Sequence, residues 1–596
     1  MNGRLSPKCI SILLVLVLAV AFFGGVATCR WNTHGNERTL HAWFSDLTLQ
    51  FARNWYRDGV VTLRGALFWK PASPEFPDLP SRRMHSSYPP GMLFPVYLAA
   101  LVEGSDPMPR HVDIANACCQ LALMVCCALI VFLFALRAGG SLVDAGVFAC
   151  VPILLLGLLP CPYYYFDKCY FSYEAVVPLA ALFLLLEMLR DETLSKRAMV
   201  CLCLLQGATA FAGTFTEWLF PLVAGCVYLK RLVSGDLGRG WRGFLRGSVF
   251  FWLPVGAALS IFAAQVYFLG GYAYLQDRFL LRTGSSQGIF LALTELNPFW
   301  YRHMLRLFGG IGLAALATVA AALLVLAVLL VVRRMRQRPA DPVLRTALWV
   351  GLVALIPCVA HVELLRNQSS FLLHGFEALK FSLPVAILPL AVMPLAVLRV
   401  TGLRWPAWAV RPGVLPSAVP VLALMLAAGY VLVMFPRIAP LYAQPMPDAN
   451  AIARAVFLDE QTGPRDIVFT PALELAQDDS PLYAAYSMKL VYLAKTLSEV
   501  HDKVRNIRGD YDICFFNPTA RLPGEPHYAG LLARSDAKAV YGDYTLYRVS
   551  KDVFLAAWED FRRDKPAHAE TKPLPPPKKP SRATGRRPAP SSVNVN

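Results

Sequence analysis

The sequence predicts a polytopic α-helical membrane protein that carries a small α/β domain in its C-terminal part. The 596 residues are 56% hydrophobic and only 16% charged, whereas a soluble chain of this size carries about 25% charged residues. Many apolar runs reach the ~20 residues that cross a hydrocarbon core. After about residue 436 the long apolar runs give way to short predicted strands and helices. These observations exclude a single soluble domain.

The first apolar run, 9–27, follows two basic residues, Arg4 and Lys8. It lacks an A-x-A cleavage site, so we expect a retained signal-anchor with its N-terminus in the cytoplasm. The next run, 113–136, returns across the membrane. The polar segment between them, 28–112, is therefore predicted to be a large external loop. A loop of this length in a membrane protein usually has a function.

The remaining apolar runs bring the predicted total to about eleven spans, and an odd number places the C-terminal segment outside. These further spans are expected at 143–160, 172–189, 198–214, 217–229, 248–268, 306–332, 344–361, 375–398 and 414–435. Lys and Arg cluster in alternate loops, as expected for the cytoplasmic side of a membrane protein. This distribution accounts for the net charge of +17 without nucleic-acid binding, which we do not expect.

The C-terminal part shows mixed helix and strand patterns. An amphipathic helix is predicted at 449–460, short buried strands at 466–470 and 511–516, helix over much of 489–508, and a hairpin around Gly542-Asp543. The predicted organisation is a transmembrane domain over 1–436, an external α/β domain over 437–562 and a disordered tail over 563–596. The tail is rich in Pro, Lys and Arg and cannot bury a core.

Asp46 follows the first span and opens an amphipathic segment of the external loop. The apolar side chains Phe44, Leu47, Phe51 and Trp55 share one face at helical spacing. We expect this helix to lie in the membrane interface, where a carboxylate can reach a lipid-linked substrate. An alternative is a solvated acid that is stabilised near a helix N-terminus.

The sequence Tyr88-Pro89-Pro90-Gly91 begins a second predicted helix, 92–101, because proline is common at helix starts. An acidic residue after span one followed by a Pro-Pro helix resembles the GT-C superfamily of membrane glycosyltransferases. The group that it resembles most contains the protein O-mannosyltransferases and lipid A aminoarabinose transferases. The family often has Asp-Glu at the first motif, and here Asp46 is followed by Leu47.

Three further segments are similar to family motifs. Tyr170–Ala175 contains Glu174 at the entry to a span, where the family often has an acidic residue. Ala210–Pro221 resembles a turn between spans five and six, with Thr216 in place of the usual lysine and Glu217 after it. The segment 374–384 resembles the entry to a late span and contains His374 and Lys380.

The resemblance implies an inverting enzyme that moves a hexosyl or pentosyl group from a polyprenyl-phosphate donor to a lipid, glycan or protein acceptor of the cell envelope. Asp46 would be the general base that takes the proton of the acceptor hydroxyl. The reaction would occur on the outer face of a bacterial inner or plasma membrane. The enzyme would be integral to that membrane, with its C-terminal domain outside.

Cations are expected around the phosphate of the donor, because the leaving group is an anion. The candidates for binding the donor phosphate or the substrate are Tyr88, Glu174, Glu217, Arg278, Arg282, Arg366, His374 and Lys380. Each cation alone also fits an anchor at the membrane interface, and each glutamate also fits a helix cap. His374 and Lys380 are the more interesting pair, because charge is costly at the entry to a span.

No cysteine or histidine spacing indicates a metal site, so no cofactor is predicted. Cys161 and Cys169 flank one short loop and are expected either as a disulfide or as two free thiols. One alternative function is that of a membrane transporter or lipid flippase, and another is that of a non-catalytic assembly or sensor protein that uses the external domain. Transporters usually show related halves and broken helices at the bilayer midplane, whereas this chain shows no repeat. Its polar residues lie at the outer ends of spans, which favours an enzyme.

Overall fold

The structure is a computed structural model that describes most of the chain. The described residues are 6–35, 39, 41–192, 194–238, 240–283, 296–337, 341–369, 374–401, 417–443, 450–472, 481–519 and 526–564. Contacts divide the chain into two compact units. The first comprises 1–464 and 477–491, and the second comprises 465–476 and 492–596.

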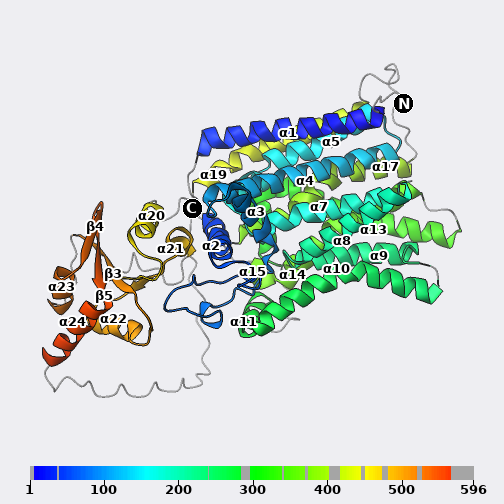
Figure 1. Cartoon of the computed structure of the whole chain (residues 1–596). Coiled ribbons are helices and arrows are strands. Elements are labelled where there is room, and N and C mark those ends of the chain that lie inside the picture. Colours follow the sequence, from blue (N-terminus) through cyan, green and yellow to red (C-terminus); the bar gives the residue numbers. More distant parts are fainter. Residues whose placement is uncertain are drawn as a thin grey trace, which may run out of the picture. The chain divides into compact units, whose positions relative to one another are not determined.

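The first unit is a bundle of long apolar helices (Figure 1). Within the described residues, nine helices are long and apolar enough to cross a membrane. They are α1 (Pro7–His34), α4 (Pro109–Arg137), α7 (Ser172–Arg190), α8 (Lys196–Thr214), α10 (Gly240–Phe268), η4–α13 (Trp300–Met335), α14 (Pro342–Leu364), η5–α17 (Gly375–Thr401) and α18–α19 (Ala418–Tyr442). The prediction of a polytopic α-helical membrane protein is confirmed.

Two of the predicted spans take other forms. The span expected at 143–160 is a pair of helices, α5 (Leu142–Leu158) and α6 (Pro160–Lys168), bent by 57° at the break. Pro160 explains the break, because proline lacks the N–H that would continue the helix. The span expected at 217–229 is α9 (Leu219–Ser234), which has 16 residues. The pair makes ten candidate spans if it is counted as one, and the shorter helix α9 would be the eleventh.

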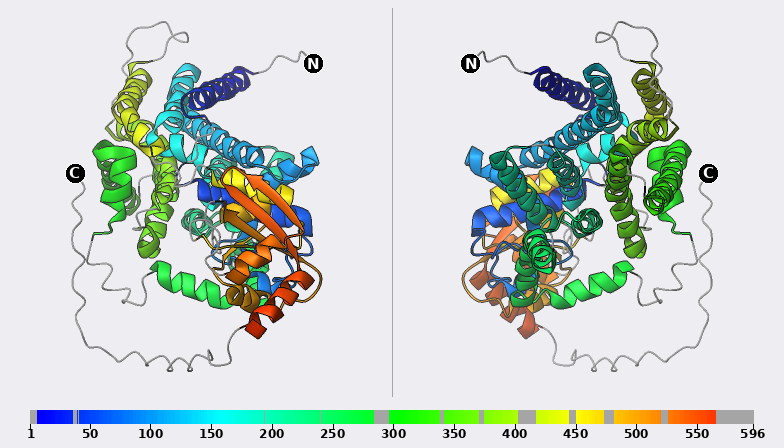
Figure 2. Two further views of the ribbon diagram at one scale, coloured as in Figure 1. Left: turned by 90° about the vertical axis from the view of Figure 1, so that its left-hand side faces the viewer. Right: turned by 90° about the vertical axis from the view of Figure 1, so that its right-hand side faces the viewer.

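The centre of the bundle is α4, which packs against α5 and α7, while α8 and α10 extend the bundle beyond α7. Figure 2 shows α1 at one edge of the bundle. Leu13, Leu14 and Val17 of α1 are 52%, 63% and 57% exposed. An apolar surface of this kind is stable only against lipid, so it is expected for a span at the edge of a bundle.

The short elements of the large loop gather at one end of the bundle (Figure 1). They are α2 (Ala42–Asp58), η1 (Pro80–Arg82), η2 (Pro90–Met92) and α3 (Leu93–Glu103). Two elements from later in the chain lie at the same end, α11 (Tyr272–Thr283) and α15 (Arg366–Ser369). In the views of Figure 2, α11 runs across the bundle rather than along it.

The apolar face of α2 packs against protein, so the prediction that Trp55 anchors this helix in lipid is wrong, while its position at the depth of the membrane interface stays a prediction. Its apolar face is 5% exposed at Phe44 and 0–1% exposed at Leu47, Phe51 and Trp55. The Trp55 indole N–H is donated to the Ala66 carbonyl at 2.9 Å and not to the lipid interface. The amphipathic pattern was the correct signal for a buried face, but it does not distinguish a protein core from a bilayer.

The second unit is built around a sheet with the strand order β2-β1-β3-β5-β4. The strands are β1 (Ile467–Thr470), β2 (Val491–Leu493), β3 (Asp512–Pro518), β4 (Ala537–Tyr541) and β5 (Tyr544–Ser550). β1 pairs with β3 in parallel, and β5 pairs antiparallel with both β3 and β4. The helices of this unit are α22 (Leu497–Val504), α23 (Pro526–Ala533) and α24 (Lys551–Asp564). The predicted hairpin is present, and Gly542 has the positive φ of 54° that its tight turn requires.

Other details of the C-terminal part differ from the prediction. The segment 489–508 contains the strand β2 as well as the helix α22. The predicted boundary lies at residue 436, whereas the compact units divide the chain after Pro464. The helices α20 (Ala451–Gln461) and α21 (Pro481–Ser487) belong to the first unit. The predicted tail begins within α24, and its residues from 565 onward lie outside the described part of the chain.

Candidate functional site

The helix α2 separates two cavities of the first unit. Ala42, Ser45, Asp46 and Leu49 line a cavity of about 590 Å³, which we call the aspartate cavity. Trp43, Phe44 and Leu47 line a cavity of about 750 Å³, which we call the arginine cavity. Successive residues of a helix are rotated by about 100°. The two sets therefore lie on roughly opposite sides of the first two turns of α2.

The aspartate cavity combines charged and apolar side chains. Asp46 is 1% exposed and shares the cavity with Arg30, Arg110, Asp113, Asp167 and Lys168. The Arg30 guanidinium donates to the Gln120 side-chain oxygen at 2.7 Å and lies 4.4 Å from the Tyr163 ring centroid. Ile452 of α20 and Tyr486 of α21 complete the lining. The cavity therefore has a buried carboxylate beside cations, in walls that are partly apolar.

Hydrogen bonds to the backbone fix α2 and thereby Asp46. Ser45 Oγ accepts the Tyr170 N–H at 3.1 Å, and Thr48 Oγ1 donates to the Tyr170 carbonyl at 2.8 Å. One turn later, Arg53 donates to the carbonyls of Ala485 and Tyr486 at 2.8 and 2.9 Å. These bonds hold α2 in one rotation about its axis, and in that rotation Asp46 faces the aspartate cavity.

The arginine cavity is lined by three arginines and many aromatic rings. Arg278, Arg282 and Arg302 provide the positive charge. The Arg282 guanidinium lies 4.5 Å from the centroid of the Tyr88 ring and donates to the Ser87 carbonyl at 3.3 Å. Arginine binds phosphate through several N–H donors in one plane. Such a surface suits an anionic group that is joined to an apolar chain.

Two histidines also line the arginine cavity, and both are neutral at physiological pH. Burial lowers the pKa of His85 to about 3, and Arg282, Arg278 and Arg83 lower it as well. Burial likewise lowers the pKa of His374 to about 4. The predicted role of His374 in binding the donor phosphate stays a prediction. An imidazole can still accept or donate a hydrogen bond.

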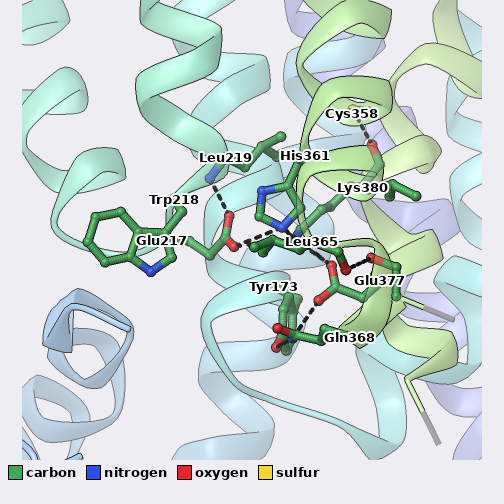
Figure 3. Close-up of polar contacts among 12 residues, drawn as sticks. Tyr173, Glu217, Trp218, Leu219, Cys358, His361, Leu365, Gln368, Glu377 and Lys380 are labelled. Carbon is green, nitrogen blue, oxygen red and sulfur yellow. Dashed lines mark hydrogen bonds and ion pairs between the residues drawn. The ribbon is translucent and has the colours of Figure 1, made fainter. Parts of the chain in front are cut away.

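Behind the wall of the arginine cavity lies a buried ion cluster, which Figure 3 shows. Lys380 Nζ is 3.2 Å from Glu217 Oε1, 2.6 Å from Glu377 Oε2 and 2.5 Å from His361 Nε2. These four side chains are at most 2% exposed. An ammonium group has three N–H donors, and Lys380 directs all of them at partners within the cluster. We name these four side chains the Lys380 cluster.

A buried glutamine connects the Lys380 cluster to the cavity wall. Gln368 Nε2 lies 2.9 Å from Glu377 Oε1, 2.8 Å from the Tyr88 hydroxyl and 3.2 Å from the Tyr173 hydroxyl. The two tyrosine hydroxyls are 2.5 Å apart. Tyr88, Tyr173 and Gln368 all line the arginine cavity. The chain of contacts therefore runs from Lys380 through Glu377 and Gln368 to Tyr88.

The structure brings half of the predicted phosphate- and substrate-binding residues together. The residues that line the arginine cavity are Tyr88, Arg278, Arg282 and His374. Glu217 and Lys380 lie in the Lys380 cluster instead. Glu174 is fully buried and accepts the Phe171 N–H at 2.7 Å, which is the helix-cap alternative. Arg366 is half-buried at the start of α15, next to the lining residues Asn367 and Gln368.

Sequence reasoning did not identify Tyr173, His361, Gln368 and Glu377. Glu377 and Lys380 are three residues apart, and this spacing was the one available signal for a buried ion pair within the sequence. Gln368 is neutral and lies 280 residues from Tyr88. A single sequence contains no signal for such a distant contact.

Among the described residues, no group of three or more His, Cys, Asp and Glu side chains is arranged to hold a metal ion. The expectation that no cofactor is required stays a prediction. Cys161 and Cys169 are both buried and are separate thiols. Of the two alternatives that the sequence allowed for these cysteines, the structure has the free thiols.

No protein-family model matches the sequence, and neither does any curated protein sequence. Solved structures do match the fold. The oligosaccharyltransferase AglB from Archaeoglobus fulgidus, in complex with an inhibitory peptide and a dolichol-phosphate, is similar over 91% of this chain and 77% of its own, with 11% identity and a TM-score of 0.47.

ArnT from Cupriavidus metallidurans, bound to undecaprenyl phosphate, is similar over 91% of this chain and 98% of its own, with 12% identity and a TM-score of 0.48. The same protein in the apo state covers 89% of this chain and 97% of its own, with 13% identity and a TM-score of 0.47.

Proposed function

We propose that this protein is an inverting glycosyltransferase that moves a hexosyl or pentosyl group from a polyprenyl-phosphate donor to a cell-envelope acceptor, with Asp46 as the general base. The observation that carries this proposal is the common wall that α2 forms between two unlike cavities. One cavity holds a buried carboxylate, and the other holds arginines among aromatic rings. The cavities are lined by neighbouring residues at the start of α2, such as Phe44 and Ser45. Transfer therefore requires the sugar of a donor held in the arginine cavity to extend past the first turn of α2 to the acceptor oxygen beside Asp46.

The arginine cavity suits the donor. Its guanidinium groups can bind the phosphate and stabilise the charge that develops as the phosphate leaves. Its aromatic and aliphatic lining, which includes Trp43 and Phe171, suits the apolar part of the lipid. The aspartate cavity suits the acceptor, because a hydroxyl must lose its proton to become a good nucleophile.

The acceptor oxygen forms a bond to the anomeric carbon while the bond from that carbon to the phosphate oxygen breaks. The proton of the acceptor hydroxyl passes to the Asp46 carboxylate, and the polyprenyl phosphate leaves with the electron pair. Attack from the side opposite the phosphate inverts the anomeric centre.

The basic loops support the orientation in which the N-terminus is cytoplasmic and the α/β unit is external, in a bacterial inner or plasma membrane. The helix α2 lines both cavities, α11 and α15 line the arginine cavity, and all three elements lie at one end of the bundle. A transporter places its substrate site near the bilayer midplane. The position of these cavities therefore supports an enzyme over a transporter or flippase.

The test is an assay of sugar transfer from a labelled polyprenyl-phosphate sugar to envelope lipids, glycans and proteins, in membranes that contain the full-length protein. We expect a labelled product that depends on the protein and whose new glycosidic bond is inverted relative to the donor. Movement of the intact donor across sealed vesicles, with no labelled product, would contradict the proposal and favour a flippase.

Arg282 offers a prediction for the donor side. Arg282→Gln removes a guanidinium group from the arginine cavity, and we expect the KM for the donor to rise about 10- to 100-fold, because a hydrogen bond to a charged group contributes about 1.5–3 kcal/mol. The matched control is Arg246→Gln, since Arg246 is exposed on α10 and lines neither cavity. Equal losses from both variants would show a general effect of charge.

Tyr486 offers a prediction for the acceptor side. Tyr486→Ala shortens a side chain in the lining of the aspartate cavity, and we expect the KM for the acceptor to rise about 10-fold through lost apolar contact. The KM for the donor should not change. Val456→Ala is the control, because Val456 lies on the neighbouring helix α20 and is 40% exposed. A changed KM for the donor in Tyr486→Ala would contradict the assignment of the two cavities.

A further inference from the structure

We infer that Gln368 is a positioning residue, which orients the Tyr88 hydroxyl so that the proton of this hydroxyl is available to a phosphate oxygen in the arginine cavity. The inference rests on the proposed function, since it assigns the phosphate of the donor to this cavity. Gln368 lies in α15, and Figure 3 shows its side chain between Tyr173 and Glu377.

Glu377 determines which way the amide of Gln368 faces. An ionised carboxylate only accepts hydrogen bonds, so the group that faces Glu377 must be the amide nitrogen. Glu377 Oε2 accepts from Lys380 Nζ at 2.6 Å, and this holds the carboxylate in place. Glu377 Oε1, on the other side, then accepts from Gln368 Nε2 at 2.9 Å.

The hydrogen bonds of Gln368 limit the partners that remain for the Tyr88 proton. The amide nitrogen has two hydrogens; one is donated to Glu377 and the other to the Tyr88 oxygen at 2.8 Å. The Tyr173 hydroxyl is 2.5 Å from the Tyr88 hydroxyl, and Gln368 presents only N–H donors to it. One of the two tyrosine protons therefore lies between the two hydroxyl oxygens, and the other is left for a third group. When Tyr173 donates to Tyr88, the Tyr88 oxygen accepts two hydrogen bonds and its own proton is the one that is left; this is the arrangement that we propose.

The surroundings favour a donated proton at this position. Tyr88 is 2% exposed and Gln368 is 6% exposed, and hydrogen bonds are stronger where water is excluded. Burial raises the pKa of the Tyr88 phenol above its ordinary value, so the hydroxyl keeps its proton at physiological pH. The Arg282 guanidinium over the Tyr88 ring places a positive charge beside the same position in the cavity.

The experiment is a double-mutant cycle with Tyr88→Phe, Gln368→Met and the double variant of the full-length protein. The readouts are the affinity for undecaprenyl phosphate, the kinetics of sugar transfer and the thermal stability. We expect each single variant to weaken binding of undecaprenyl phosphate about 10-fold. The double variant should bind no more weakly than Tyr88→Phe alone, because Gln368 acts through the hydroxyl that Tyr88→Phe removes.

Gln206→Met is the matched control. Gln206 is also a buried glutamine whose Nε2 donates to a glutamate, Glu187, at 2.9 Å, and it lines neither the aspartate nor the arginine cavity. Its substitution should lower stability without changing the affinity for undecaprenyl phosphate. Losses from Tyr88→Phe and Gln368→Met that multiply to about 100-fold, or an unchanged affinity in either single variant, would overturn the inference. Non-additive binding in a protein that transfers no sugar would support the inference and overturn the proposed reaction.

Discussion

Asp46→Asn is expected to lower the rate of sugar transfer by about 10²–10⁴-fold, the usual contribution of a positioned general base. The substitution preserves the shape of a side chain that is 1% exposed and lines the aspartate cavity. Asparagine cannot accept the proton of the acceptor hydroxyl, so the nucleophile stays weak. Binding of undecaprenyl phosphate should be unchanged, because the arginine cavity is on the other side of α2.

The measurement is transfer of labelled sugar in membranes with matched protein levels, together with the affinity for undecaprenyl phosphate. Asp78→Asn is the control, since Asp78 is an exposed residue of the same large loop and lines neither cavity. If Asp46→Asn transfers sugar at the parental rate, Asp46 is not the base. If both variants lose activity equally, the loop is sensitive to any change of charge.

Lys380→Met is expected to destabilise the folded protein by about 3–5 kcal/mol, the cost of leaving a buried charge without its partner. Glu217 and Glu377 are 0% exposed, and Lys380 Nζ lies 3.2 and 2.6 Å from them. His361 accepts from Lys380 through Nε2 at 2.5 Å, so it adds no positive charge in this arrangement. Without Lys380, two carboxylates remain in a medium that disfavours both.

The measurement is thermal unfolding of the detergent-solubilised protein. A triple variant, Lys380→Met with Glu217→Gln and Glu377→Gln, should recover most of the lost stability, because replacing a whole buried ion cluster by neutral groups is often tolerated. A single variant that is as stable as the parent would show that Lys380 does not balance these carboxylates. A triple variant no more stable than Lys380→Met would show that packing, and not charge, is the cause.

The sequence was sufficient for the parts of the fold that have a periodic or compositional signal. The long apolar runs predicted the spans, and the alternating strands predicted the sheet around Gly542. Asp46 was identified because it opens the amphipathic segment after the first span, at the position where the GT-C motif has an acidic residue. The amphipathic face of α2 was also visible, but apolar spacing alone did not show that protein, and not lipid, covers Trp55.

The rest of the site depends on contacts between distant segments. Lys380 and Glu217 are 163 positions apart in the sequence. The sequence therefore did not show their pairing, and Lys380 was interpreted as a cation that binds phosphate at the start of a span. His374 likewise looked like a cation, because the burial that lowers its pKa is a property of the fold. Gln368 is uncharged and belongs to no motif. Its proposed role depends on contacts with Tyr88, Tyr173 and Glu377, which only the fold brings together.

The division of the chain into units has a consequence for recombination and protein engineering. The chain passes from one unit to the other after Pro464, returns after Ala476 and leaves again after Val491. A chimera that exchanges the α/β unit therefore needs three junctions, since a single crossover after Pro464 would also replace α21 and its contacts with Arg53. Because Tyr486 of α21 lines the aspartate cavity, we expect the sequence of the C-terminal part to change in evolution together with the residues of that cavity.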